Sequence, residues 1–273
     1  MSVRVITDSA SDIPPSVAKE LGIIVVPLTV MFGDEELLDG IDISSDQFFE
    51  KLQTSEFHPR TSQPSVAQFS KAYEEAGKNE IISIHVSEKL SGTLNSASLA
   101  AKEAPGKVEL FDTRGASSWV ATVAIAAAKS ANEGKSLKQV TEVAQTVSDN
   151  LEAYFLLDTL EYLQKGGRIG KAQALLGGLL NIKPILHVAE GEVHPYEKVR
   201  TRAKGLAKLI ETAKKNAPFK EISIMHGSAG EDAEVLSKSL AELSETPVSV
   251  RSVGPVIGVH TGPGVIGIVL RKA

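Results

Sequence analysis

Three short segments rich in hydroxyl groups, glycine and proline carry most of the chemistry in this sequence. They read TSQP at residues 61–64, LSGT at residues 90–93 and HTGPG at residues 260–264. Hydroxyl groups and exposed backbone N–H groups donate hydrogen bonds to anions such as a carboxylate or a phosphate. The sequence has no cysteine, and no acid/base pair or metal-binding cluster accompanies the segments. They are therefore expected to hold a ligand rather than transform it.

The first half of the chain alternates between strand and helix signals. Apolar runs at residues 3–7, 23–30, 81–86 and 108–111 predict strands. Because parallel strands need crossover helices, this succession predicts a three-layer α/β domain with a parallel sheet over residues 1–150. Pro15 and Gly22 mark the start and the end of a first helix. Capping boxes of Ser44 with Gln47 and of Ser65 with Gln68 mark the starts of two more. An alanine-rich helix is expected from about residue 118 to residue 131, before Gly134.

After residue 150 the order of the elements changes. Apolar runs at residues 184–188 and 193–199 flank Glu190 and Gly191, which predicts an antiparallel hairpin. Mixed strand directions with helices on one side predict a second, two-layer α+β domain with a mixed sheet over residues 151–273. Its other strands are expected near residues 154–157, 222–225, 248–252 and 265–270.

The composition excludes several classes of function. The chain has 273 residues, 42% of them hydrophobic, and a formal net charge of -5. This acidic balance, without a basic stripe interleaved with aromatic residues, argues against nucleic-acid binding. With no signal-peptide pattern, no apolar stretch long enough to span a bilayer and no cysteine, we expect a cytoplasmic protein.

Acidic residues near the N-terminus support an alternative, enzymatic interpretation. Asp8 and Asp12 follow the first expected strand, where paired carboxylates can hold Mg²⁺. A small-molecule kinase or hydrolase would use them with that metal. The sequence contains no Gly-Lys-Ser/Thr phosphate loop and no Gly-x-Ser-x-Gly nucleophile motif, so this interpretation is the weaker one.

Five motifs, in order, resemble those of the DegV family. They are ITDSASD at residues 6–12, TSQP, LSGT, KGGRI at residues 165–169 and HTGPG, and they span essentially the whole chain. The family is known as bacterial fatty-acid-binding proteins that present an acyl chain to a partner fatty acid kinase. The resemblance implies a two-domain α/β fold with a long-chain fatty acid between the domains. It implies a lipid-binding carrier with no cofactor and no catalytic residues of its own, whose kinase partner makes acyl phosphate for phospholipid synthesis.

The resemblance also assigns roles to residues. In the family the fatty-acid carboxylate is bound at positions that correspond here to Thr61, Ser91 and His260. Two hydroxyl groups from different loops can donate charge-assisted hydrogen bonds to both carboxylate oxygens. The supporting residues in the same motifs are Ser62, Gly92, Thr93 and Thr261.

An acyl chain also needs an apolar tunnel. Burying a methylene group contributes about 0.8 kcal/mol, so a long chain could gain on the order of 10 kcal/mol before ordering costs. Candidate lining residues are Leu28, the small-residue helix at residues 120–128 and the apolar run at residues 175–180. Trp119 stands where the family usually has a Gly-rich stretch, and we expect it to alter tunnel length or chain preference.

Basic residues offer a second binding surface. In the family, the arginine of the KGGR motif and one in a later Arg-Thr stretch engage the kinase or the phosphorylated product. These positions correspond here to Arg168 and Arg200, and a planar guanidinium suits an acyl phosphate. The expected partners are a long-chain fatty acid and the catalytic subunit of a fatty acid kinase, and transient contact with a membrane is compatible with this role.

Overall fold

The computed structural model describes residues 2–176 and 182–272 and divides the chain into two compact units. Unit 1 comprises Met1–Ile43 and Thr61–Asp149, and unit 2 comprises Ser44–Arg60 and Asn150–Ala273. The single division expected after residue 150 therefore misses Ser44–Arg60. That segment joins unit 2 because its helix α2 (Ser45–Thr54) packs on α10 (Pro255–Thr261), and the Ser45 hydroxyl donates to the Val253 carbonyl at 2.6 Å.

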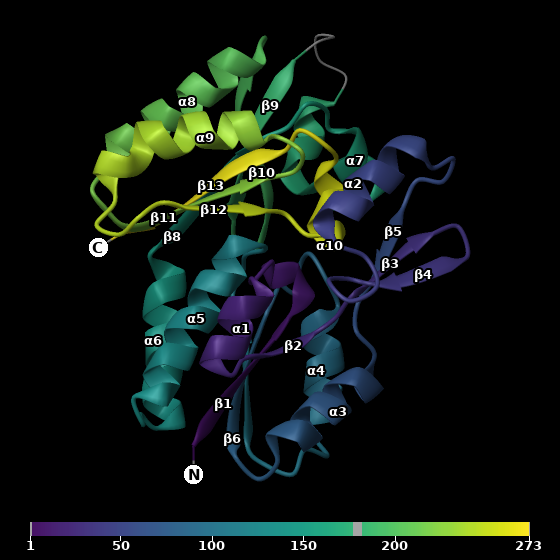
Figure 1. Cartoon of the computed structure of the whole chain (residues 1–273), viewed down its shortest axis with the longest axis vertical. Helices are drawn as coiled ribbons and strands as arrows, with labels where there is room; N and C mark the ends of the chain where they lie inside the picture. Colours follow the sequence, from purple (N-terminus) through teal and green to yellow (C-terminus); the bar gives the residue numbers. More distant parts are fainter. Residues whose placement is uncertain (1, 177–181, 273) are drawn as a thin grey trace. The chain divides into compact units, whose positions relative to one another are not determined.

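Unit 1 is built on the expected parallel sheet. The strands lie in the order β2-β1-β6-β7 and all neighbours pair in parallel (Figure 1). Helices cover both faces (Figure 1). On one face α5 (Ser118–Asn132) packs on β1 and β6; on the other, α3 (Val66–Ala76) buries its Phe69 and Tyr73 beside α4 (Thr93–Ala101). The strands are β1 (Val3–Asp8), β2 (Ile24–Val26), β6 (Glu80–His85) and β7 (Val108–Asp112).

Local sequence signals place the helices of unit 1. Pro15 starts α1, and Gly22 ends it in the left-handed conformation, with a φ of 67°. The capping box of Ser65 with Gln68 opens α3, and the box of Ser44 with Gln47 opens α2 in unit 2. The helical elements of unit 1 are η1 (Ser9–Ser11), α1 (Pro15–Leu21), α3 (Val66–Ala76), α4 (Thr93–Ala101), α5 (Ser118–Asn132) and α6 (Leu137–Asp149).

The apolar run at residues 23–30 forms two strands, so the expectation of one strand is wrong. The run breaks at Pro27, which has no N–H group to donate to a continuing ladder. Beyond the break, β3 (Thr29–Phe32) leaves the parallel sheet and pairs antiparallel with β4 (Glu35–Leu38). A three-stranded sheet results, in the order β4-β3-β5, and β5 (Arg60–Ser62) carries Thr61.

Unit 2 is built on the expected mixed sheet, in the order β10-β9-β8-β13-β11-β12. Neighbours pair antiparallel except β11 and β12, which are parallel. Glu190 and Gly191 turn the β9–β10 hairpin with positive φ angles of 52° and 81°. The strands are β8 (Leu151–Leu156), β9 (Lys183–Ala189), β10 (Glu192–Val199), β11 (Phe219–His226), β12 (Ser249–Ser252) and β13 (Ile266–Lys272).

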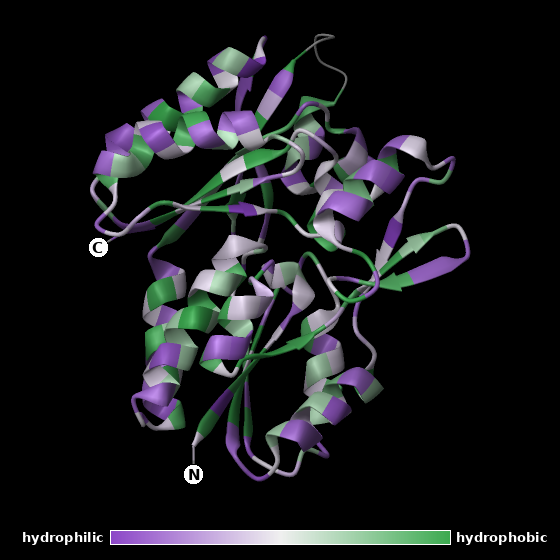
Figure 2. Cartoon of the chain, viewed as in Figure 1, coloured by the Kyte–Doolittle hydropathy of each residue, from purple (hydrophilic) through white to green (hydrophobic). Residues whose placement is uncertain are grey.

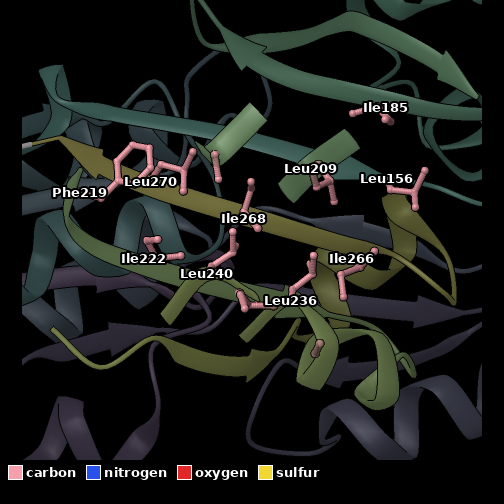
Figure 3. Close-up of a cluster of buried hydrophobic side chains, with 13 residues drawn as sticks. Leu156, Ile185, Leu209, Phe219, Ile222, Leu236, Leu240, Ile266, Ile268 and Leu270 are labelled. Atoms are coloured by element: carbon pink, nitrogen blue, oxygen red, sulfur yellow. The ribbon is translucent and has the colours of Figure 1, made fainter. Parts of the chain in front are cut away.

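Two long helices cover one face of this sheet. Polar and apolar residues alternate along both α8 (Arg202–Asn216) and α9 (Gly230–Leu240) (Figure 2), and the buried apolar residues of both helices pack with those of the sheet. Leu209, Leu236 and Ile268 lie together in the resulting core (Figure 3). The shorter helical elements of unit 2, besides α2 and α10, are α7 (Glu161–Lys165), η2 (Gly170–Leu175) and η3 (Ala241–Leu243).

Candidate functional site

The TSQP and LSGT segments meet within unit 1 through Gln63. The Gln63 side chain donates from Nε2 to the Ser96 hydroxyl of α4 at 3.0 Å. Its amide also lies against the α-carbon of Gly92, so closely that a β-carbon there would overlap it. Gln63 was not assigned a role from the sequence. Its place inside the TSQP motif was the only available signal, because the contact spans about thirty residues.

Ser91 and Thr93 form a hydroxyl pair at the start of α4. Their oxygens lie 2.8 Å apart, and Ser91 Oγ accepts the backbone N–H of Thr93 at 3.3 Å. Two hydroxyl groups carry two protons and their shared bond uses one, so the pair can donate one more hydrogen bond. Thr93 is fully buried and Ser91 half-buried, which gives Ser91 the access to a ligand. Thr61 is likewise half-buried, whereas Ser62 is exposed and donates weakly to the Gln63 carbonyl at 3.4 Å.

A pocket with a cavity volume of about 530 Å³ adjoins the LSGT segment. Ser91, Gly92 and Leu94 line it together with charged and polar residues such as Glu88 and Asn95. Acyl chains are held by predominantly apolar walls. This pocket is therefore not the tunnel expected for an acyl chain.

In unit 2 two glycines bring the HTGPG segment against the KGGRI segment and against α7, which precedes it. The α-carbon of Gly166 lies against Nδ1 of His260, and the α-carbon of Gly262 lies against the ring of Tyr162. The Gly166 N–H donates to the Tyr162 carbonyl at 2.9 Å. The Arg168 guanidinium donates from Nη1 to the Gly166 carbonyl at 2.8 Å. Two expected site residues, Arg168 and His260, are thus brought together within one unit.

His260 is held in its neutral form. Burial is the main cause, and with the neighbouring positive charge of Arg168 and the imidazole of His58 it lowers the pKa of His260 to about 4. A neutral imidazole donates from one ring nitrogen only, so His260 offers a ligand one N–H group at neutral pH. An anion bound beside it would favour the protonated form and raise this pKa.

The HTGPG segment differs from a simple anion-binding loop. His260 and Thr261 form the last turn of α10, where the helix dipole presents its negative end. The Thr261 hydroxyl donates to the Ile257 carbonyl one turn earlier, at 2.9 Å. The imidazole, rather than free backbone N–H groups, is therefore the donor that this segment provides.

His58 lies in the same part of unit 2 and was not foreseen from the sequence. Its ring centroid is 5.7 Å from that of Tyr162. Burial and the nearby Lys165 ammonium lower the pKa of His58, while Glu161 opposes them. We call His58, Tyr162, Gly166, Arg168 and His260 the imidazole cluster.

Arg200 is exposed and lies at the end of β10, next to the Thr201 N-cap of α8. The neighbouring Arg202 is more closely tied to the HTGPG segment. Its Nη1 donates to the Gly264 carbonyl at 2.7 Å and lies 3.3 Å from the Asp158 carboxylate, and its Nε contacts Asp232. Arg202 thus fixes one end of the motif, a role that the sequence analysis did not assign.

The carboxylates of the enzymatic alternative are occupied by the protein itself. Asp8 is fully buried and accepts from Ala10 N at 3.0 Å, from Val86 N at 3.0 Å and from the His85 ring at 2.9 Å. Asp12 accepts the Ser117 hydroxyl at 2.5 Å. These bonds organise the loops after β1 and β6, and they leave Asp8 without an open side for a metal ion.

His85 continues a buried polar chain that superficially resembles a catalytic triad. Its other ring nitrogen is 2.7 Å from the Ser83 hydroxyl, which is 3.0 Å from the Tyr73 hydroxyl. All of these side chains, including Asp8, are completely buried. A nucleophile needs access to its substrate, so this chain is structural.

The residues and segments expected to line an acyl tunnel lie in different surroundings. Leu28 is buried, and its backbone N–H donates to the Ser9 hydroxyl at 3.0 Å. Trp119 packs its indole on the α-carbon of Gly115 and donates from Nε1 to the Ser148 hydroxyl of α6 at 3.3 Å. The small-residue helix forms part of α5, which packs on β1. Of the run at residues 175–180, residues 177–180 lie outside the described part of the chain.

Two further findings concern metals and membranes. Among residues 2–176 and 182–272, one group of potential metal ligands lies close together. It consists of Glu190, Glu192 and His194 on the β9–β10 hairpin. The Lys171 ammonium lies 3.4 Å from Glu190 and 3.5 Å from Glu192, so the two carboxylates already have a cationic partner.

No helix in the described part of the chain is long and apolar enough to cross a membrane.

Comparison with known proteins places the fold and the motifs in one family. The family model described as uncharacterised protein, DegV family, matches residues 2–273. A DegV domain-containing protein of Streptomyces coelicolor is 39% identical, with 99% of this chain and 98% of that protein covered. A solved structure titled as fatty acid binding of a DegV family protein from Thermus thermophilus is 35% identical, with a TM-score of 0.93 and both chains fully covered. DegV from Bacillus subtilis, titled a fatty acid binding protein, is 33% identical, with a TM-score of 0.90 and both chains fully covered. Motifs, fold and similarity over the whole chain agree, and this protein belongs to the DegV family.

Proposed function

We propose that this protein binds a long-chain fatty acid and carries it without transforming it. The observation that carries the proposal is the whole-chain similarity to solved DegV proteins that are titled as fatty-acid-binding proteins. The metal-dependent alternative is weaker, because Asp8 is completely buried and already accepts three hydrogen bonds from the protein, which leaves no room for the water ligands that Mg²⁺ usually keeps.

The carboxylate of the fatty acid is assigned to Thr61, Ser91 and His260. Support comes from the additional hydrogen bond that the Ser91–Thr93 pair can donate and from the neutral imidazole of His260. The assignment draws on both units, with two hydroxyl groups from unit 1 and one imidazole from unit 2. Charge-assisted hydrogen bonds of this kind are about twice as strong as neutral ones.

Organic extraction and mass spectrometry of the purified protein test the binding function. Co-purified fatty acid at close to one molecule per chain is the expected result. Ser91→Ala and His260→Gln should each lower the retained fatty acid, whereas Ser239→Ala should not, because the Ser239 hydroxyl donates only to the Val235 carbonyl on the same helix, α9. A protein that carries no lipid and takes up none from solution would contradict the proposal, above all if it hydrolysed nucleotides unaided.

We further propose that the loaded protein presents its fatty acid to a fatty acid kinase, which forms the acyl phosphate for phospholipid synthesis. Arg168 and the exposed Arg200 are the residues assigned to this step. Reconstitution with a fatty acid kinase and ATP tests it. Arg200→Glu should reduce acyl-phosphate formation by tenfold or more, an effect of about 1.4 kcal/mol, and should reduce loading much less. Equal loss of loading and turnover would contradict a role specific to presentation.

A further inference from the structure

The imidazole cluster concentrates positive and potentially positive groups at one place in unit 2. Gly166 lets the His260 ring approach the KGGRI backbone, and the Arg168 guanidinium is fixed there by its bond to the Gly166 carbonyl. His58 enters from the segment before β5 and packs on the Tyr162 ring. Three chain segments far apart in sequence thus bring two imidazoles and a guanidinium together.

The Nε2 atom of His58 shows that this arrangement is incomplete. The atom is buried and has no hydrogen-bond partner among residues 2–176 and 182–272. A buried polar atom without a partner destabilises the folded protein, so such atoms are rare and need an explanation. The Tyr162 ring that His58 contacts provides a face for packing and no acceptor for Nε2.

The charges in the imidazole cluster also favour a bound anion. Burial is the main factor that lowers the pKa of both imidazoles; in addition, the positive charge of Arg168 and the proximity of His58 lower the pKa of His260, and the Lys165 ammonium lowers the pKa of His58. Mutual repulsion of this kind is relieved when an anion lies among the groups. The charged or titratable groups facing the two imidazoles are Glu161, Tyr162 and Lys165 on α7, Arg168 in the following loop, and the other imidazole in each case.

We propose that His58 is a binding residue of the His260 site and that it takes up a proton when the anionic head of the ligand occupies that site. Occupancy is then coupled to proton uptake, and the ligand binds more tightly as the pH falls from 8 to 6. This inference rests on the proposed function, because it takes the carboxylate head of a fatty acid as the anion. Glu161, which forms an ion pair with Lys165 at 2.6 Å, limits the proton uptake, because its carboxylate raises the pKa of His58 before any ligand binds.

Isothermal titration calorimetry with laurate, used below its micelle concentration, measures the coupling. Titrations at pH 6 and pH 8 in buffers of different ionisation enthalpy give the number of protons taken up. Laurate stays ionised over this range because a carboxyl group ordinarily titrates near pH 4. Dodecanol has a chain of the same length without a charge and serves as the uncharged control ligand. His58→Gln keeps a hydrogen-bonding amide but cannot titrate, and His194→Gln on the β9–β10 hairpin is the matched protein control.

The expected result is measurable proton uptake by the wild type at pH 6, and less in His58→Gln. Wild-type affinity for laurate should rise from pH 8 to pH 6, by up to about tenfold for each imidazole whose pKa rises by one unit. The His194→Gln variant should behave as the wild type, and dodecanol should show no uptake. NMR titration of the His58 ring in the wild type, with and without laurate, gives the same answer without any substitution.

Laurate binding with equal proton uptake in the wild type and His58→Gln, or an unchanged His58 titration, would overturn the inference and leave the proposed function intact. No laurate binding at any pH would overturn both. The two failures are therefore distinguishable in one set of titrations.

Discussion

The α-carbon of Gly166 lies against Nδ1 of His260, so residue 166 has no room for a β-carbon. One glycine of the KGGRI motif thereby determines where the imidazole of the HTGPG motif can lie. The two motifs are about ninety residues apart in sequence, and the contact gives both a single physical reason for their composition.

Replacing Gly166 with alanine should displace the His260 ring. A β-carbon at residue 166 would overlap Nδ1, and the ring must rotate or the loop must shift. We expect fatty-acid affinity to fall tenfold or more, which corresponds to about 1.4 kcal/mol. Calorimetry measures the change. Gly230→Ala, at the start of α9 where a β-carbon meets nothing within 4 Å, is the control and should leave affinity unchanged.

A second glycine gives a sharper test in unit 1. Gly92→Ala should displace the flexible end of the Gln63 side chain and break its bond to Ser96, with a cost of about 0.5–1.5 kcal/mol in the free energy of unfolding. In a Gln63→Ala background the obstacle is absent, so the same substitution should cost little. A double-mutant cycle from urea unfolding measures this coupling. Additive effects of the two changes would show that the Gln63–Gly92 contact does not matter.

The stability of the protein should depend on pH through His260. Burial lowers its pKa from the ordinary value of 6.5 to about 4, so between these values the unfolded chain binds more protons than the folded one. The free energy of unfolding should therefore fall as the pH drops from about 6.5 towards 4. His260→Gln should flatten part of this dependence. Unfolding curves at several pH values check it, and an unchanged slope in the variant would count against the lowered pKa.

Asp8 should prove structural rather than catalytic. Asp8→Ala removes the acceptor for three donors in a buried network, and we expect a loss of about 3 kcal/mol or more in the free energy of unfolding. Asp34→Ala, at an exposed turn, should change stability by less than about 0.5 kcal/mol. Calorimetric titration of the wild type with Mg²⁺ should show no binding at Asp8. Tight Mg²⁺ binding that disappears in Asp8→Ala would restore the enzymatic alternative.

Trp119 supports the packing of α5, and we also expect it to influence which acyl chains are bound. Trp119→Phe keeps a ring on Gly115 but loses the hydrogen bond to Ser148, at a cost of about 1 kcal/mol beyond the change in packing. The hypothesis that Trp119 sets tunnel length or chain preference predicts a shift in the co-purified acyl chains, read by mass spectrometry. Normal loading with an unchanged profile would show that the residue only supports the α5–α6 contact.

Local signals predicted much of the secondary structure because their physics is local. Pro15 and Gly22 bound α1, since proline fits a first helical turn and glycine accepts the left-handed conformation. Both capping boxes formed as expected, because each involves residues three apart. The run at residues 23–30 divides between two sheets, because hydrophobicity alone does not determine which sheet a strand joins.

The assignment of Ser44–Arg60 to unit 2 could not be predicted in this way. Its α2 helix carries Phe48 and Phe49, which pack on glycines of the C-terminal half, including Gly258. A helix with a correct capping box looks the same whichever unit it packs on. Which unit α2 packs on depends on surface complementarity with residues about two hundred positions later in the sequence.

The sequence by itself determined the fold class, the ordered motifs and the donor groups that suit an anion. Each follows from residue type, from short-range spacing or from the similarity of whole motifs. Only the tertiary structure decided what those motifs do to one another. Gln63 contacts Gly92, Gly166 contacts His260, and His58 and Arg168 both lie close enough to His260 to shift its pKa, because side-chain packing between distant segments fixes distances that sequence spacing does not encode.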